Sequence, residues 1–297
     1  LRGVSAFVTV QEGCDKFCTF CVVPYTRGAE ASRPVQGILQ EIEALVAFGV
    51  KEIVLTGQNV NAYSGAKVNG GFASLAELIN LISNIKEVVR IRYTTSHPCD
   101  MQDDLIEAHR DIQKLMPNLH LPAQSGSDRI LAAMNRNHTR ADYLETIKKI
   151  RRVIPNITFT SDFIVGFPGE TEEDFNLLAE FITQANLDAI GIFGYSDEDK
   201  TEALDLPNKV DSEVIAERVQ SLSSLADEMV TLRAASRIGE QVRVLIEDEE
   251  NQEGCAAHQG PEVDGTTSFV GTSFKVGEYV DGVVTQSLGA DLIARPL

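Results

Sequence analysis

The stretch Gly13-Cys-Asp-Lys-Phe-Cys-Thr-Phe-Cys21 contains three cysteines in a C-x3-C-x2-C pattern: Cys14, Cys18 and Cys21. A structural zinc site normally has four ligands, often as two C-x2-C pairs. No second pair follows here, because Cys99 and Cys255 each stand alone. Three thiolates on a 4Fe–4S cluster leave one iron open for a substrate. The triplet therefore predicts one such cluster, with these cysteines as metal ligands at the catalytic centre, and disfavours a disulfide or a zinc knuckle.

The chain of 297 residues is long enough for one large domain and a small one. Its 43% hydrophobic and 24% charged residues are ordinary for a globular protein. It has no apolar run of membrane-spanning length and no signal peptide, and its five cysteines fit a reducing compartment. We therefore expect a cytoplasmic protein without a membrane segment. Because the chain starts at Leu1 without methionine, we also expect a piece of a longer protein.

Short apolar runs alternate with amphipathic stretches from Ser5 to about Ile190, as in repeated βα units. The predicted strands are Ala6–Val10, Glu52–Thr56, Val89–Thr94, Asn118–Leu121, Ile157–Ile164 and Ala189–Phe193. The predicted helices are Val35–Phe48, Leu75–Ile85, Met101–Asp111, Ser127–Met134, Arg140–Arg152 and Glu172–Ala185. Six units are too few for a closed eight-fold barrel, so the pattern predicts an α/β fold, a partial (βα)6 barrel. Ligands of such barrels gather where the strands end, which is where the cysteine loop begins.

The pattern changes in the last third of the chain. Residues 211–237 predict one long, charged amphipathic helix. After Gly239, short alternating runs between Gly- and Asp-rich turns predict a small antiparallel β domain with strands at Gln241–Ile246, Thr267–Val270, Tyr279–Thr285 and Leu292–Ala294. We therefore expect a core with a linking helix over residues 1–237 and a second domain over 238–297.

Polar residues recur at successive strand ends and together indicate a central pocket. They are Gly57, Gln58 and Asn59 after the second strand, Ser96 and His97 after the third, Gln124 after the fourth, and Ser161, Asp162 and Gly166 within and after the fifth. Each of them alone fits an ordinary turn. An acidic side chain within an apolar strand needs a partner, so we expect Asp162 to meet a ribose hydroxyl or a buried arginine. We expect the histidines without ligand-like neighbours at the surface or in turns: His109, His138 and His258.

The cysteine spacing, with aromatic Phe20 before the last cysteine, resembles the radical S-adenosylmethionine (SAM) superfamily. The resemblance implies that the open iron chelates the amino and carboxylate groups of SAM, and that the reduced cluster splits the sulfonium to a 5′-deoxyadenosyl radical. It also implies that the turn after the second strand binds the SAM amino group. The cofactor-binding residues expected on this basis are Phe20, Gly57, Gln58, Asn59, Ser96, Gln124, Ser161, Asp162 and Gly166.

Longer segments resemble the methylthiotransferase branch of that superfamily. They are Gly13–Pro34, Gly57–Tyr63, Thr94–Pro98, Leu119–Asp128 and Ser161–Glu170, and they are similar to the MiaB type, which methylthiolates a modified adenosine next to the tRNA anticodon. Gly194–Asp199 and Ala256–Gly265 look instead like the RimO type, which methylthiolates an aspartate of a small-subunit ribosomal protein. The small β domain resembles the TRAM domain shared by both types.

The resemblance also indicates what this piece lacks. The family carries an N-terminal domain with three further cysteines for a second, auxiliary 4Fe–4S cluster, and that domain is missing here. We therefore expect SAM binding and cleavage without complete methylthiolation. One SAM would donate a methyl group and a second would generate the radical. The implied electron donor is a reductant such as flavodoxin or ferredoxin, and we expect a monomer. A different radical SAM reaction, such as simple methylation, is the enzymatic alternative.

Charge bears on the choice of substrate. The net charge is −18, and residues 187–297 carry 22 acidic against 8 basic side chains. Nucleic-acid binders usually show a basic surface, because phosphate neutralisation supplies most of their affinity. The acidic third favours a basic ribosomal protein, whereas the barrel motifs favour tRNA, which we take as the leading prediction. The non-enzymatic alternative is an RNA- or ribosome-binding module with a structural cluster.

Overall fold

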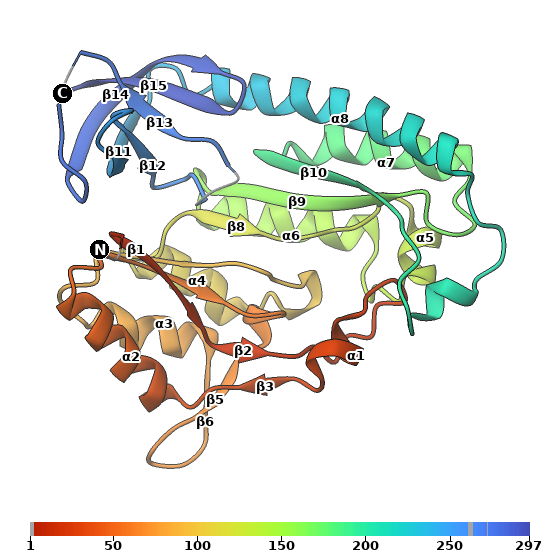
Figure 1. The fold of residues 1–297 in the computed structure, drawn as a ribbon, viewed down its shortest axis with the longest axis horizontal. Helices are drawn as coiled ribbons and strands as arrows, with labels where there is room; N and C mark the ends of the chain where they lie inside the picture. The colour runs from red at the N-terminus through yellow and green to blue at the C-terminus, as the bar shows by residue number, and fades with distance from the viewer. Residues whose placement is uncertain (1–2, 261–263, 272) are drawn as a thin grey trace.

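The computed structural model describes residues 3–260, 264–271 and 273–297, and its core is an open barrel of parallel strands (Figure 1). One sheet has the order β1-β4-β7 and the other β8-β9-β10, and a parallel bridge between Ile91 and Leu115 joins them. The bounds are β1 Ser5–Thr9, β4 Glu52–Thr56, β7 Arg90–Tyr93, β8 Asn118–His120, β9 Thr158–Val165 and β10 Ala189–Gly194. The predicted partial (βα)6 barrel is confirmed.

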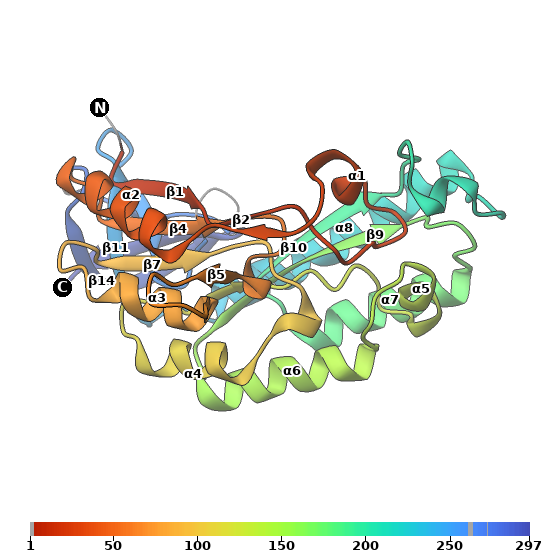
Figure 2. The same ribbon diagram turned by 90° about the horizontal axis from the view of Figure 1, so that it is seen from below.

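Helices cover the outside of the strands. They are α2 Val35–Ala47, α3 Leu75–Ser83, α4 Asp103–Asp111, α5 Asp128–Ala133, α6 Arg140–Val153, α7 Glu172–Ala185 and α8 Ser212–Ala235. Figure 2 shows α3, α4, α6 and α7 on one side of the strands. Capping boxes at Ser74, Thr139 and Thr171 begin α3, α6 and α7. No described helix combines the length and the apolar character that crossing a membrane requires.

One predicted helix start is wrong by two residues. We expected a helix from Met101, but the short 3-10 helix η2 (Pro98–Asp100) precedes it, and α4 begins only at Asp103. Gln102 has extended backbone angles and acts as the N-cap, so it cannot be part of the helix. Met101, with a ψ of 85°, ends η2 and likewise lies outside the helical region.

Several short elements surround the cysteine loop and were not predicted. The two-residue strands β2 (Gln11–Glu12) and β3 (Ala31–Ser32) pair antiparallel and close the base of the loop. The helix α1 (Val23–Arg27) lies within it, and the hairpin of β5 (Ser64–Ala66) and β6 (Phe72–Ser74) packs beside it. Elements this short have no sequence periodicity to detect.

The C-terminal domain is a closed barrel with the strand order β11-β12-β13-β15-β14. Its strands are β11 Gln241–Asp248, β12 Glu253–Ala256, β13 Thr267–Phe269, β14 Tyr279–Leu288 and β15 Asp291–Pro296. The expected antiparallel arrangement holds except between β13 and β15, which pair in parallel because β13 returns to close the barrel. The strand β12 was not predicted. Residues 261–263, within the RimO-like segment Ala256–Gly265, lie outside the described residues.

This small barrel docks against the beginnings of the parallel strands, whereas the cysteine loop follows their ends (Figure 1). Arg90, the first residue of β7, donates to the carbonyl oxygens of Arg243 and Cys255. Arg92 donates to Ala256 O at 3.0 Å and Ala257 O at 3.1 Å. Between the two guanidinium groups lies the fully buried carboxylate of Glu52, 3.2 Å from Arg92 Nε and 3.8 Å from Arg90 Nη1. Buried charges are tolerated when they are paired in this way.

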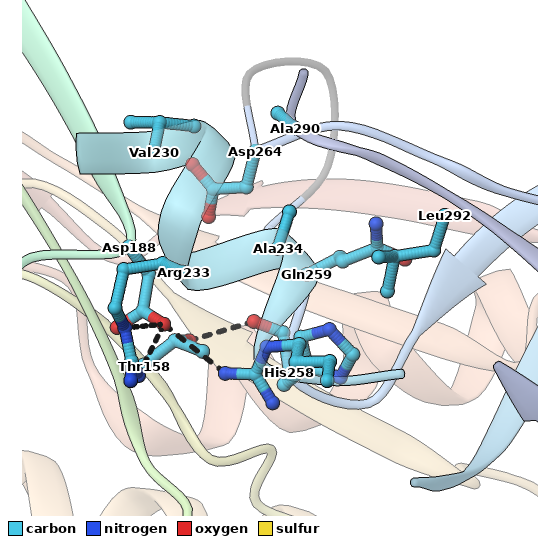
Figure 3. Close-up of a pocket in the computed structure, with 11 residues that line it drawn as sticks. Thr158, Asp188, Val230, Arg233, Ala234, His258, Gln259, Asp264, Ala290 and Leu292 are labelled. Carbon is cyan, nitrogen blue, oxygen red and sulfur yellow. Dashed lines mark hydrogen bonds and ion pairs between the residues drawn. The ribbon is translucent and has the colours of Figure 1, made fainter. Parts of the chain in front are cut away.

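A second polar cluster attaches the long helix α8 to the same end of the strands (Figure 3). Asp188 Oδ1 lies 2.8 Å from Arg233 Nη2 and 3.1 Å from Arg237 Nη2. Thr158 Oγ1 donates to His258 O at 2.6 Å, and Asn118 Nδ2 donates to Asp264 Oδ2 at 2.9 Å. The first residues of β4, β7, β8 and β9 therefore all contact the small barrel or the buried network beneath it.

The expectation that histidines without ligand-like neighbours lie at the surface or in turns holds for His258, which lies in a turn, and is wrong for His109 and His138. Both are buried, with 7% and 9% exposure. His109 lies on the inner face of α4, where its Nε2 is 2.8 Å from the hydroxyl of Tyr93. Burial lowers the pKa of His109 to about 4, since the charged imidazolium loses its hydration there.

Glu52→Gln should destabilise the chain by roughly 3–5 kcal/mol, the usual cost of leaving a buried charge without its counter-ion. Arg90 and Arg92 would then face each other without the carboxylate between them. Urea unfolding measures the change, with Glu43→Gln on the exposed face of α2 as the control. Equal stability of the two variants would show that Glu52 does not hold the network together.

The second prediction concerns acid stability. Below pH 6.5 the unfolded chain binds a proton at His109, whereas the folded chain binds it only near pH 4. The unfolding free energy therefore decreases as the pH is lowered from 6.5 to 4. His109→Gln should remove roughly 2–3 kcal/mol of the loss of unfolding free energy between pH 7 and pH 4. Tyr93→Phe, which keeps the titrating ring, should retain the wild-type pH slope. Urea unfolding at the two pH values measures it; a slope unchanged by His109→Gln would exclude His109 as its source.

Candidate active site

The three cysteines of the predicted cluster line one cavity of about 390 Å³, here called the cysteine cavity. Cys18 is buried and Cys14 and Cys21 are half-buried, and none forms a disulfide. The cavity also contains the following predicted cofactor residues: Phe20, Gly57, Gln58, Asn59, Ser96 and Gln124. The ends of four different strands therefore supply residues to one cavity, as the sequence predicted.

A buried glutamine that was not predicted connects the cysteine loop to the turn after β4. Gln11 Nε2 donates to Gly13 O at 2.6 Å, and Gln11 Oε1 accepts the backbone N–H groups of Gln58 and Asn59, each at 2.9 Å. Gln58 Oε1 in turn accepts the N–H of Gly13 at 2.8 Å. We expected Gln58 to bind SAM. Its side-chain oxygen instead accepts a hydrogen bond from the cysteine loop and helps to hold that loop in place.

Two glycines allow this close approach. A Cβ atom on Gly57 would lie 2.6 Å from the carbonyl oxygen of Gln11, which the backbone cannot accommodate. Gly13 has a φ of +73°, and a Cβ there would lie 2.2 Å from the carbonyl oxygen of Ala29 on the returning chain. Glycine is therefore required at both positions for the loop to fold against the β4 turn.

Two thiols of the cavity, Cys14 and Cys21, favour their protonated form. Burial raises the pKa of Cys14 and Cys21, and the neighbouring cysteines add to the effect. The Lys16 amide opposes the rise at Cys14, and the Val23 amide and the Arg136 guanidinium oppose it at Cys21. Metal binding at these sulfurs must therefore release their protons.

His97 is neutral in this cavity. Burial and then the positive charge of Arg136 lower its pKa to about 2. Its Nδ1 accepts the Cys99 N–H at 3.2 Å, so the imidazole carries its proton on Nε2. Asn61 fixes the backbone of His97 by two hydrogen bonds of 2.9 Å. The ring therefore offers a hydrogen-bond donor at Nε2 at neutral pH.

The cavity has the polar atoms that a bound cofactor would need. Ser96 Oγ, Asn59 Oδ1 and Arg136 Nε are buried and have no hydrogen-bond partner in the described part of the chain. No three His, Cys, Asp or Glu side chains among the described residues are grouped closely enough for a single metal ion. A 4Fe–4S cluster takes one thiolate per iron and so accepts a wider spacing than one ion does. The donor set fits a cluster with a polar ligand beside it.

The remaining predicted residues lie elsewhere. Ser161 and Asp162 line a second cavity of about 520 Å³ inside the open barrel. Ser161 is only 1% exposed, and its Oγ accepts the N–H of Ala123 at 3.0 Å. Asp162 Oδ2 lies 3.4 Å from His120 Nε2 in place of the expected arginine. Since the N–H of Gln124 donates to Asp162 O at 2.9 Å, the two cavities are neighbours.

Gly166 lies outside both cavities among the described residues. Its N–H donates to Glu170 Oε1 at 2.9 Å, and the same oxygen lies 2.6 Å from Arg218 Nη1 on α8. A Cβ on Gly166 would lie 2.3 Å from Ile215, so the glycine permits α8 to pack here.

Sequence reasoning missed Gln11 and Arg136. The only signal for Gln11 was a glutamine directly after an apolar strand, and Arg136 had none.

Gln11→Met tests the connection between the loop and the β4 turn. The side chain keeps its size but loses one donor and one acceptor, so unfolding free energy should fall by roughly 2–4 kcal/mol, each buried orphan costing about 1–3 kcal/mol. Urea unfolding measures this, with exposed Gln40→Met on α2 as the control. If both variants unfolded at the wild-type urea concentration, the side-chain hydrogen bonds of Gln11 would not contribute to stability.

Comparison with known proteins identifies both domains. The family model of the radical SAM superfamily matches residues 8–182, and that of the TRAM domain matches residues 238–297. The tRNA-2-methylthio-N(6)-dimethylallyladenosine synthases of Actinobacillus pleuropneumoniae serotype 5b (strain L20) and serotype 7 (strain AP76) are each 44% identical over 296 residues, which is 98% of this chain and 62% of theirs. The chain thus spans less than two thirds of the length of these curated relatives.

Solved structures share the fold at low sequence identity. The radical SAM methyltransferase TsrM from Kitasatospora setae has a TM-score of 0.55 at 15% identity, covering 67% of this chain and 36% of that one. The coproporphyrinogen III oxidase HemN from Escherichia coli has a TM-score of 0.54 at 16% identity, covering 80% of this chain and 54% of that one. Because the superfamily model matches more than half of the chain, this protein belongs to the radical SAM superfamily and carries a TRAM domain at its C-terminal end.

Proposed function

We propose that this chain is the catalytic core of a MiaB-type methylthiotransferase, which acts on a modified adenosine next to the tRNA anticodon. The observation that supports this most strongly is the 44% identity to tRNA-2-methylthio-N(6)-dimethylallyladenosine synthases over 98% of the chain, including its acidic last third. The chain corresponds to 62% of the length of those relatives, so complete methylthiolation belongs to the longer protein. We assign the core to residues 1–237 and the TRAM domain to 238–297.

Cys14, Cys18 and Cys21 would hold one 4Fe–4S cluster, and Asn59 and Ser96, which line the same cavity, would lie beside the SAM bound to it. Together the cluster and SAM supply a carbon-centred radical when an electron is delivered. Gln11 and Gln58 hold the cysteine loop in place, and the raised pKa values of Cys14 and Cys21 mean that cluster loading releases protons there.

The second cavity is the space for the reacting part of the substrate. Its size of about 520 Å³ lies in the usual range of ligand pockets, and it adjoins the cysteine cavity through Gln124 and Asp162. Exposed aromatic rings flank it on the two edge strands, Phe7 on β1 and Phe193 on β10. Asp162 and His120 provide polar contacts inside it. A flipped nucleobase is bound by stacking and by such edge contacts.

Three further assignments complete the proposal. The auxiliary 4Fe–4S cluster that handles the sulfur would lie in a part of the longer protein beyond this chain. A low-potential electron donor such as flavodoxin or ferredoxin would reduce the cluster held by the three cysteines. The chain would act as a monomer in the cytoplasm.

The charge of the TRAM domain favours a second candidate, a RimO-type reaction on a basic ribosomal protein. Residues 239–297 carry 11 acidic and 3 basic side chains. Such a surface repels tRNA phosphates and attracts a basic protein at low salt. Mass spectrometry of tRNA and ribosomal proteins from a host that expresses the full-length form separates the two. Methylthiolated adenosine supports the first candidate, and methylthiolated aspartate supports the second.

The cluster assignment has a direct test. Alanine at Cys14, Cys18 or Cys21 removes one iron bond, so each variant should lose the bound iron and the dithionite-driven conversion of SAM to 5′-deoxyadenosine. Cys99→Ala is the matched control, because Cys99 is exposed and its Sγ donates to the backbone carbonyl of Asn137 at 3.1 Å. Iron analysis and chromatography after anaerobic reconstitution measure both effects. A triplet variant with full iron content and full cleavage would refute the assignment.

A further inference from the structure

The side chain of Arg136 reaches one of the three cysteines from a distant part of the chain. It lies just beyond the end of α5 and is 8% exposed. Its Nη1 donates to Cys18 Sγ at 3.6 Å, and its Nη2 donates to Pro122 O at 2.7 Å. The Nε group is buried without a partner in the described residues. The guanidinium is therefore directed at the cysteine cavity and is only partly satisfied there.

Arg136 differs from the other buried arginines of the described chain because it has no carboxylate partner. The described chain contains the following buried arginines: Arg90, Arg92, Arg136, Arg218 and Arg237. Four of them have an acidic partner within 4.0 Å, namely Glu52, Glu170 or Asp188. Arg136 forms no such ion pair with a described residue, and its nearest acidic group is the thiol of Cys18. A buried cation needs an anion, and a cluster-bound Cys18 thiolate would provide it.

The position of Arg136 is tied to the cysteine loop by backbone contacts. The N–H of Thr19 donates to Met134 O at 3.1 Å, and the hydroxyl of Thr19 donates to Ala133 O at 2.9 Å. Asn135, with a φ of +57°, directs its Nδ2 to Phe17 O at 2.8 Å. These contacts join the end of α5 to both sides of Cys18. The contact between the guanidinium and the sulfur is therefore built into the fold.

We propose that Arg136 is a positioning residue that raises the reduction potential of the cluster held by Cys14, Cys18 and Cys21, an inference that rests on the proposed function. Hydrogen bonds to cluster sulfurs and nearby positive charge favour the reduced state, which carries one more negative charge. The step concerned is a single electron transfer. An external low-potential one-electron donor is oxidised by one electron, the cluster is reduced by one, and no covalent bond changes.

The test is a redox titration of the full chain after anaerobic reconstitution, followed by electron paramagnetic resonance with dithionite as reductant. Arg136→Gln should lower the ratio of reduced to oxidised cluster at a fixed potential about tenfold, a downward shift of about 59 mV for one electron. Arg136→Lys keeps the charge but lacks the planar guanidinium. Its midpoint potential should lie between those of wild type and Arg136→Gln. Exposed Arg152→Gln removes the same charge far from the cavity and should leave the midpoint unchanged.

The outcomes separate this inference from its alternatives. Equal midpoints in wild type, Arg136→Lys and Arg136→Gln overturn it. If Arg136→Gln retains no iron, the comparison of wild type with Arg136→Lys decides: a lower midpoint supports the inference, and an equal one overturns it. An unchanged midpoint with SAM affinity reduced tenfold also overturns it, since Arg136 would then serve the SAM carboxylate. Wild-type protein that binds no iron instead refutes the proposed function on which the inference rests.

Discussion

The buried carboxylate of Glu52 between Arg90 and Arg92 is the interaction on which the arrangement of the two domains depends. Arg90 and Arg92 are the first and third residues of β7. They donate to the backbone carbonyls of β11, β12 and the residue after β12. Without the carboxylate, two like charges would be buried side by side. Since backbone carbonyls accept these donors, the docking depends on the shape of the TRAM barrel more than on its side chains.

This docking divides the parallel strands into two ends with different roles. At their beginnings, the TRAM barrel and α8 cover the open barrel through ion pairs and hydrogen bonds. At their ends, the cysteine loop and the turns after β4, β7 and β8 surround the cysteine cavity. The second cavity lies between the two and includes residues of both domains. A substrate that enters this cavity would therefore contact the TRAM domain as well as the core.

Burial of arginines also lowers the number of positive side chains at the surface of the protein. The chain has 26 basic and 44 acidic residues, and the buried arginines are engaged with the interior of the fold. Arg90 and Arg92 lie at the domain junction and so cannot neutralise phosphates. The TRAM barrel itself has 11 acidic and 3 basic side chains in residues 239–297, so a phosphate backbone would approach it only weakly. Under the proposed function, an RNA substrate would be bound at the open barrel by stacking and base-edge contacts more than by charge.

Periodicity and residue spacing predicted the order of the βα units, the TRAM-like β domain and the cluster site at the cysteine triplet, because both are local properties that can be read before the chain folds. Which side chains meet became visible in the folded structure. Gln58, expected at the SAM site, holds the cysteine loop by a hydrogen bond to Gly13. Ser161 and Asp162, expected at the same site, line the second cavity, and His109, expected at the surface or in a turn, is buried. Arg136 contacts Cys18 across 118 residues of sequence. Such partners depend on strand register and loop closure, and no local pattern encodes them.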